Sequence, residues 1–126
     1  MTLFEYLQMA ENDFDTYDTK YDTGVTVCHI CEADEADEYD KFCNGIIKKV
    51  DVVEINGDTL TVNWSELIER NIDKFKEFTA KHWRHQYEKD IDEFEYQWIN
   101  EIHMYMAGYV SEDFYSVLNK FVDSLS

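Results

Sequence analysis

The chain has no proline and only four glycines among its 126 residues. Because glycine is so scarce, neither a phosphate-cradling loop nor the glycine fingerprint of dinucleotide-binding proteins has a candidate here. Residues 63–107 contain neither glycine nor proline, so nothing in this stretch forbids a helix. We therefore expect the rest of the chain to pack around it.

Cysteines and long apolar runs are also scarce. Three cysteines cannot all pair within one chain, which fits a reducing cytosol. No apolar stretch approaches the roughly 20 residues needed to span a bilayer. Residues 1–10 carry no basic residue ahead of an apolar core, so we expect no signal peptide. The expected location is cytoplasmic.

Basic residues are outnumbered by acidic ones. Eleven lysines and arginines face 28 aspartates and glutamates, giving a formal net charge of −17. Such a surface repels nucleic acid and anionic lipid and attracts basic proteins. An aromatic content of 16% and a hydrophobic content of 44% argue against disorder. The length fits a single domain spanning residues 1–126.

The order of apolar patterns predicts an α+β fold, with a small antiparallel sheet of about three strands packed on three or four helices. Strands are expected at 24–31, 46–55 and 59–63, and helices at 2–11, 64–88, 91–107 and 112–125. The dipeptide Asn56-Gly57 predicts a hairpin turn between the second and third strands. With Ile55 opposite Asp58, Val53 would pair with Leu60 in the core.

Capping signatures set the expected helix ends. Thr2 with Glu5 three residues later is a capping box. Asp90 with Glu93 repeats the pattern, so the stretch 63–107 is expected to divide near Lys89 into two helices. One long, bent helix remains the alternative.

The acidic residues are unevenly placed. Residues 1–40 hold twelve acids and one lysine. The excess is greatest in segments 11–22 and 32–40 and in the helix that begins at Asp90, whose acids are expected to have no basic partner. Carboxylates three or four residues apart on a helix lie about 5–6 Å apart, which approaches the charge density of DNA when rows lie side by side.

In its size, in the acidic stretches Glu11–Asp22, Glu32–Asp40 and Asp90–Glu101, and in lacking catalytic signatures, the chain resembles small acidic inhibitors encoded by phages and mobile elements. These inhibitors are of the anti-CRISPR and antirestriction type, and several of them mimic DNA. The resemblance is one of physical type, and no family motif matches residue by residue. It implies a non-enzymatic protein, without a cofactor, that occupies the nucleic-acid site of a basic nucleic-acid-binding protein or nuclease.

The residues expected to bind that partner are acids of these segments and tyrosines that lie among them, because tyrosine is enriched at contact hot spots. We expect them to gather into one continuous outward surface. They are Asp13, Asp15, Tyr17, Asp18, Tyr21, Asp22, Asp34, Glu35, Asp37, Glu38, Asp92 and Glu95.

Two alternatives stay open. An immunity protein or antitoxin would use a similar acidic surface against a toxic nuclease. A small zinc protein could instead be built on Cys28, Cys31 and Cys43 with a histidine. A strand at 24–31 would place Cys28 and Cys31 on opposite faces, so buried cysteines and no metal site are expected.

Calcium and histidine metal sites are not expected either. Segment 11–22 does not align with the ligand positions of a calcium-binding loop. His82 and His85 lack the carboxylate three residues earlier that helical metal sites usually add.

Overall fold

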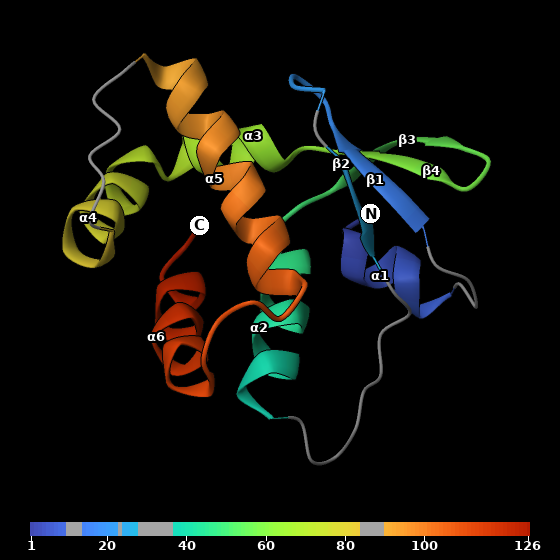
Figure 1. Ribbon diagram of the computed structural model, residues 1–126. Helices are drawn as coiled ribbons and strands as arrows, with labels where there is room; N and C mark the ends of the chain where they lie inside the picture. Colours follow the sequence, from blue (N-terminus) through green and yellow to red (C-terminus); the bar gives the residue numbers. More distant parts are fainter. Residues whose placement is uncertain (10–13, 23, 28–36, 84–89) are drawn as a thin grey trace.

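The computed structural model describes residues 1–9, 14–22, 24–27, 37–83 and 90–126. Helices and strands follow one another along the chain, and the α+β class is confirmed (Figure 1). The elements are α1 (Leu3–Gln8), β1 (Phe14–Asp18), β2 (Gly24–Val27), α2 (Glu38–Ile47), β3 (Val52–Asn56), β4 (Thr59–Val62), α3 (Trp64–Arg70), α4 (Ile72–His82), α5 (Ile91–Met106) and α6 (Glu112–Asp123).

The sheet within these described ranges has the strand order β2-β1-β4-β3. Strand β1 runs antiparallel to β2 but parallel to β4, so the sheet is mixed and the expectation of an antiparallel sheet is wrong. The reason is that β1 lies in the acidic segment 11–22, where no strand was expected. Its residues alternate: Phe14, Thr16 and Asp18 are buried, whereas Asp15 and Tyr17 face outward.

Strands β3 and β4 form the expected hairpin with a different turn. Gly57 and Asp58 form the loop, and Gly57 has a φ of 64°, a conformation that costs glycine little. Ile55 therefore pairs with Leu60. Val53 does not face Leu60, and 60% of it is exposed. The predicted register is wrong because the turn begins one residue later than the Asn56-Gly57 dipeptide suggests.

The first part of the expected strand 46–55 is helical. Ile46 and Ile47 end α2 and are buried with Phe42, four residues before Ile46 on the same helical face. Helix α2 packs along α6, and this tertiary contact overrides the strand preference of β-branched residues. The strand β3 begins at Val52, and β2 accounts for 24–27 of the expected strand 24–31, whose remainder lies outside the described residues.

The described residues of the stretch 63–107 form three helices, so the single bent helix is wrong. The break before Asp90 is confirmed: α4 ends at His82, and the Asp90 side chain accepts a hydrogen bond from the Glu93 amide at the start of α5. A further break falls at Asn71, where α3 gives way to α4. The buried Asn71 amide donates to the Leu67 carbonyl and accepts from the Ser126 amide, so it competes with the helix for backbone partners.

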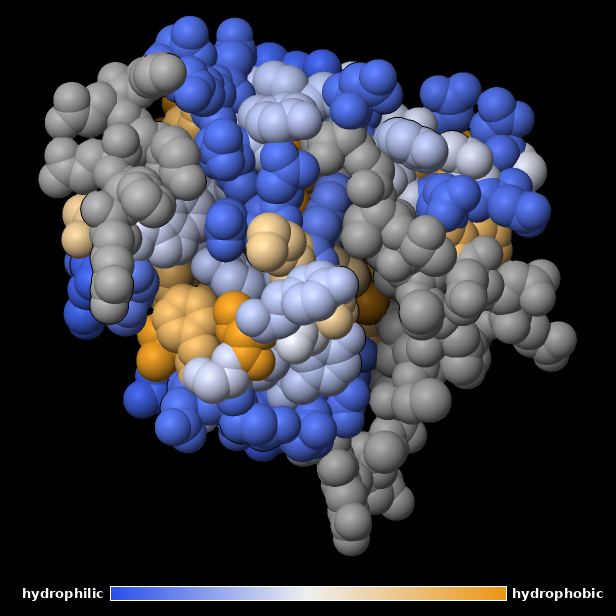
Figure 2. Space-filling model, in the orientation of Figure 1, coloured by the Kyte–Doolittle hydropathy of each residue, from blue (hydrophilic) through white to orange (hydrophobic). Residues whose placement is uncertain are grey.

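Helix α5 crosses the centre of the molecule and supplies the middle of the core (Figure 1). Trp98 is buried, stacks on Trp83 with ring centroids 4.5 Å apart, and donates from Nε1 to the Thr79 hydroxyl at 2.8 Å. In Figure 2 the visible face is mostly hydrophilic, and hydrophobic atoms gather in a small area low on the left, where α6 lies. Among the described residues, no helix combines the length and apolar character that crossing a membrane requires.

Tyr115 predicts a loss of stability at alkaline pH. The ring is buried, and its hydroxyl donates to the Tyr105 carbonyl at 2.6 Å. Burial raises the pKa of Tyr115 to about 12, whereas an unfolded tyrosine ionises near 10. The stabilisation is therefore complete below pH 10 and is lost as the pH rises towards 12. Urea unfolding followed by circular dichroism across this range should show the decline.

The variant Tyr115→Phe keeps the ring but cannot ionise. We expect it to cost about 1 kcal/mol at neutral pH, from the lost hydrogen bond, and to reduce the alkaline decline. Tyr109→Phe is the matched control, because Tyr109 is 76% exposed. Equal alkaline declines in wild type and Tyr115→Phe would contradict the assignment.

Candidate partner-binding surface

The turn after β1 is organised by the Asp18 carboxylate. Asp18 Oδ2 accepts from the amides of Lys20 at 2.8 Å and Tyr21 at 3.1 Å, which bends the chain back towards β2. Asp18 Oδ1 accepts from the Ser65 amide at 2.8 Å, in the first turn of α3. Asn63, at the N-cap of α3, makes no capping bond with its side chain, so Asp18 caps this helix from a distant part of the chain.

The turn brings Lys20 and Tyr21 against the first turns of α5. Lys20 Nζ lies 2.8 Å from Asp92, 3.2 Å from Glu95 and 3.2 Å from Glu69 of α3. The Tyr21 hydroxyl lies 2.6 Å from Glu95 Oε2 and 3.0 Å from Asp92 Oδ1. We call Lys20, Tyr21, Glu69, Asp92 and Glu95 the Lys20 cluster.

The acids of the Lys20 cluster differ in whether they are buried or exposed. The Glu95 side chain is inaccessible, and burial raises its pKa. The Asp92 side chain is 62% exposed, and its hydrogen bond from Lys20 lowers its pKa. The same contact with Asp92 raises the pKa of Lys20. Lys20 is therefore a fixed cation that allows one carboxylate to be buried while others stay at the surface.

Exposed acids surround this turn. Asp22 follows Tyr21 directly, Asp90 caps α5, and the Glu69 side chain is 47% exposed. Tyr96, which is 41% exposed, meets Tyr21 edge to face with ring centroids 6.1 Å apart. Around Lys20, the protein therefore presents several carboxylates flanking two tyrosines. We call Tyr21, Asp22, Glu69, Asp90, Asp92 and Tyr96 the turn surface; all of them are exposed except Tyr21, which is half-buried.

The outward face of the sheet adds a smaller acidic area. Asp15 and Tyr17 of β1 are exposed, and Glu54 of β3 is exposed opposite Thr61, which also pairs with Tyr17. Asp15 and Tyr17 are therefore placed where the sequence predicted them, at the surface.

Asp37 and Glu38 lie elsewhere. They begin α2, at the end of the molecule opposite the β1–β2 turn and the start of α5 (Figure 1). The Asp37 side chain accepts from the Asp40 amide. Glu38 accepts from Asn119 of α6 at 2.6 Å, and this hydrogen bond is the main cause that lowers the pKa of Glu38. The expected single continuous surface is therefore wrong for the described residues, whose acids gather at separate places.

The structure also corrects two expected contact residues. Asp18 is 7% exposed and Glu95 is inaccessible, so both carboxylates serve the fold and cannot meet a partner. The expectation that the acids of the helix from Asp90 lack a basic partner is wrong for Asp92 and Glu95, because Lys20 reaches both. Asp13, Asp34 and Glu35 lie outside the described residues.

Sequence reasoning missed Glu69 and Tyr96 as parts of this surface. Glu69 lies in a helical segment where acids and bases nearly balance, so the local charge did not indicate an acidic binding surface there. Tyr96 falls just off the apolar stripe of α5, and that offset is the one local sign that it faces outward.

The three cysteines considered for a zinc site lie in two parts of the chain. Cys43 is a half-buried cysteine on α2, while Cys28, Cys31 and His85 lie outside the described residues. In the described part of the chain, no group of three or more histidine, cysteine or acidic residues could hold a metal ion.

Comparison with protein families, with curated proteins and with solved structures found no match to this chain.

Proposed function

We propose that the protein is a non-enzymatic, cytoplasmic inhibitor that binds a basic nucleic-acid-binding protein or nuclease and occupies its nucleic-acid site. A CRISPR effector or a restriction enzyme is the proposed kind of target, as for inhibitors of the anti-CRISPR and antirestriction type. The observation that carries the proposal is the turn surface, where exposed carboxylates from three separate elements surround Tyr21 and Tyr96.

The mechanism is competition for a cationic groove. A net charge of −17 steers the protein towards a basic surface and raises the association rate. Asp22, Asp90 and Asp92 then take the place of phosphates, while Tyr21 and Tyr96 supply apolar contact area with a polar tip. Because Lys20 is held by hydrogen bonds and ion pairs, the carboxylates around it are already positioned before the partner arrives.

We propose that Asp15 and Tyr17, on the outward face of the sheet, extend the contact made by the turn surface. Asp37 and Glu38, at the start of α2, are a separate proposed contact. Asp13, Asp34 and Glu35 remain proposed contact residues on charge alone.

A charge-matched pair of variants tests the proposal. The first neutralises the proposed contact with Asp15→Asn, Asp22→Asn, Asp90→Asn and Asp92→Asn; asparagine also caps helices well, so α5 keeps its start. The second neutralises four exposed acids outside the turn surface and the sheet face, with Asp73→Asn, Glu112→Gln, Asp113→Asn and Asp123→Asn. Both alter the net charge equally.

Inhibition of DNA cleavage by a CRISPR effector nuclease and by a restriction endonuclease is then measured at low and high salt. We expect the first variant to inhibit about tenfold less well and with a flatter salt dependence, because fewer charges meet the basic groove. The second variant should stay close to wild type. If both variants lose inhibition equally, net charge matters and the turn surface does not. If neither variant loses inhibition, the proposed contact is ruled out.

A further inference from the structure

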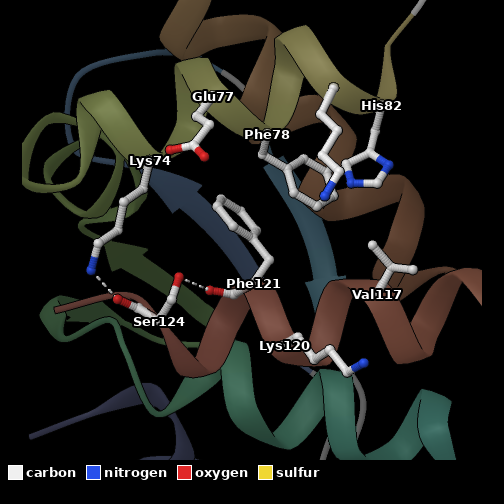
Figure 3. Close-up of a pocket in the computed structure, with 9 residues that line it drawn as sticks. Lys74, Glu77, Phe78, His82, Val117, Lys120, Phe121 and Ser124 are labelled. Carbon is white, nitrogen blue, oxygen red and sulfur yellow. Dashed lines mark hydrogen bonds between the residues drawn. The ribbon is translucent and has the colours of Figure 1, made fainter.

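Helices α4 and α6 line an open pocket of about 540 Å³, and none of its lining residues belongs to the acidic surfaces described above. Pockets of about 300–1,000 Å³ are the usual size for small organic ligands. Figure 3 shows the rings of Phe78 from α4 and Phe121 from α6 between the two helices, with charged side chains around them.

The pocket has an aromatic floor. Phe78 and Phe121 stack with ring centroids 4.3 Å apart and an interplanar angle of 27°. His82 lies against Phe78, with centroids 4.4 Å apart, and burial with the neighbouring Lys81 lowers the pKa of His82. A neutral imidazole, tilted by 39° from the Phe78 ring, therefore adds a third ring to this aromatic surface, which suits an aromatic, apolar group.

The rim of the pocket is basic, although the chain as a whole is strongly acidic. Lys74, Lys81 and Lys120 line it, and Glu77 is the one acid among the described residues that do. Lys74 donates to the Ser124 carbonyl. Lys81 and Lys120 are exposed, and neither side-chain ammonium forms an ion pair or hydrogen bond with another residue in the described part of the chain. Three of the eleven basic residues thus surround one pocket in a protein of net charge −17.

We infer that the pocket between α4 and α6 binds a small organic anion with a planar aromatic body. The body would lie on the Phe78–Phe121 surface, and its acidic group would be held by Lys81 and Lys120. A cation beside an apolar floor favours such amphipathic anions over both neutral aromatics and simple inorganic ions, because each part of the ligand finds a partner.

The test uses a fluorescent pair of probes that differ in charge. The anion 8-anilinonaphthalene-1-sulfonate and its neutral counterpart N-phenyl-1-naphthylamine share the same aromatic body. Each is titrated into wild type, into Lys81→Gln/Lys120→Gln, and into Lys41→Gln/Lys76→Gln. The last variant removes two exposed lysines outside the pocket and matches the change in charge.

We expect one molecule of the anion to bind per chain and the Lys81→Gln/Lys120→Gln variant to bind it about tenfold more weakly. The control variant should bind it like wild type, and the neutral probe should not distinguish the three proteins. Amide chemical-shift changes should map to α4 and α6. Should the double variant lose its near-ultraviolet circular dichroism, the single variants are each expected to weaken binding about threefold.

Equal affinity of the anion for the two double variants would overturn the inference, as would shift changes that fall away from α4 and α6. A wild-type dimer in sedimentation that becomes monomeric in Lys81→Gln/Lys120→Gln would also overturn it, because a second copy would then fill the pocket.

Discussion

Replacing Asp18 with alanine is expected to lower the free energy of unfolding by about 3 kcal/mol, although the residue lies in a segment that the sequence marks as a binding region. The carboxylate accepts hydrogen bonds from the amides of Lys20, Tyr21 and Ser65. The Ser65 amide is buried, so it would be left without a partner at the start of α3. The favourable interaction of a negative charge with the helix N-terminus would be lost as well.

Chemical denaturation of two further variants isolates this effect. Asp22→Ala removes an exposed aspartate from the same turn and should change stability by less than about 0.5 kcal/mol. Asp18→Asn keeps one acceptor oxygen, so its free energy of unfolding should lie between those of Asp18→Ala and Asp22→Ala. If Asp18→Ala were as stable as Asp22→Ala, the carboxylate would not be holding β1, the turn and α3 together.

Acidification is expected to destabilise the protein through His103 by about 3 kcal/mol at pH 4. The ring is 7% exposed, lies edge-on to Trp64 at 5.7 Å between centroids, and burial lowers its pKa to about 4. An unfolded histidine takes up a proton near pH 6.5. Between these two values the unfolded chain binds more protons, so the stability from His103 is complete above pH 6.5 and is lost as the pH falls to 4.

A comparison with His103→Phe separates this contribution from those of the many carboxyl groups. Protonation of the carboxylates reduces self-repulsion in both proteins alike and acts in the opposite direction. The difference in unfolding free energy between wild type and His103→Phe should therefore shift in favour of the variant as the pH falls from 7 to 4. A constant difference, or a His103 ring that titrates near pH 6.5 by NMR, would contradict the assignment.

The starts of α1 and α5 were predictable because their causes are local. The capping box of Thr2 and Glu5 and the cap at Asp90 form as expected, since each requires only residues three positions apart. Gly108, with a φ of 87°, ends α5 for the same kind of reason. The amphipathic stripes of α5 and α6 likewise follow from spacing within one element.

Strand partners and buried acids were not predictable in this way. β1 is a strand because Phe14 and Thr16 face the core beside β4, a neighbour more than forty positions away in the sequence. Ile46 and Ile47 are helical because α6 covers them. Both outcomes depend on which surface lies opposite, and a propensity averaged over a short window does not contain that information.

The candidate surface was likewise predictable only in its local composition and not in its contacts between distant segments. The acidic excess of segment 11–22 and of the start of α5 was visible in composition, and the two segments do meet. Their meeting point could not be foreseen, because Lys20 pairs with Asp92 and Glu95 across more than seventy positions. The same contact buries Glu95, which composition alone counts as a surface charge.

By itself, the sequence determined the class of fold, the helix caps at Thr2 and Asp90 and the large excess of negative charge, since each depends on composition or on neighbours within one helical turn. The tertiary structure alone decided which acids remain at the surface. A carboxylate can be buried only where hydrogen-bond donors or a cation replace water, and here those groups come from distant segments: the Ser65 amide for Asp18, and Lys20 with Tyr21 for Glu95.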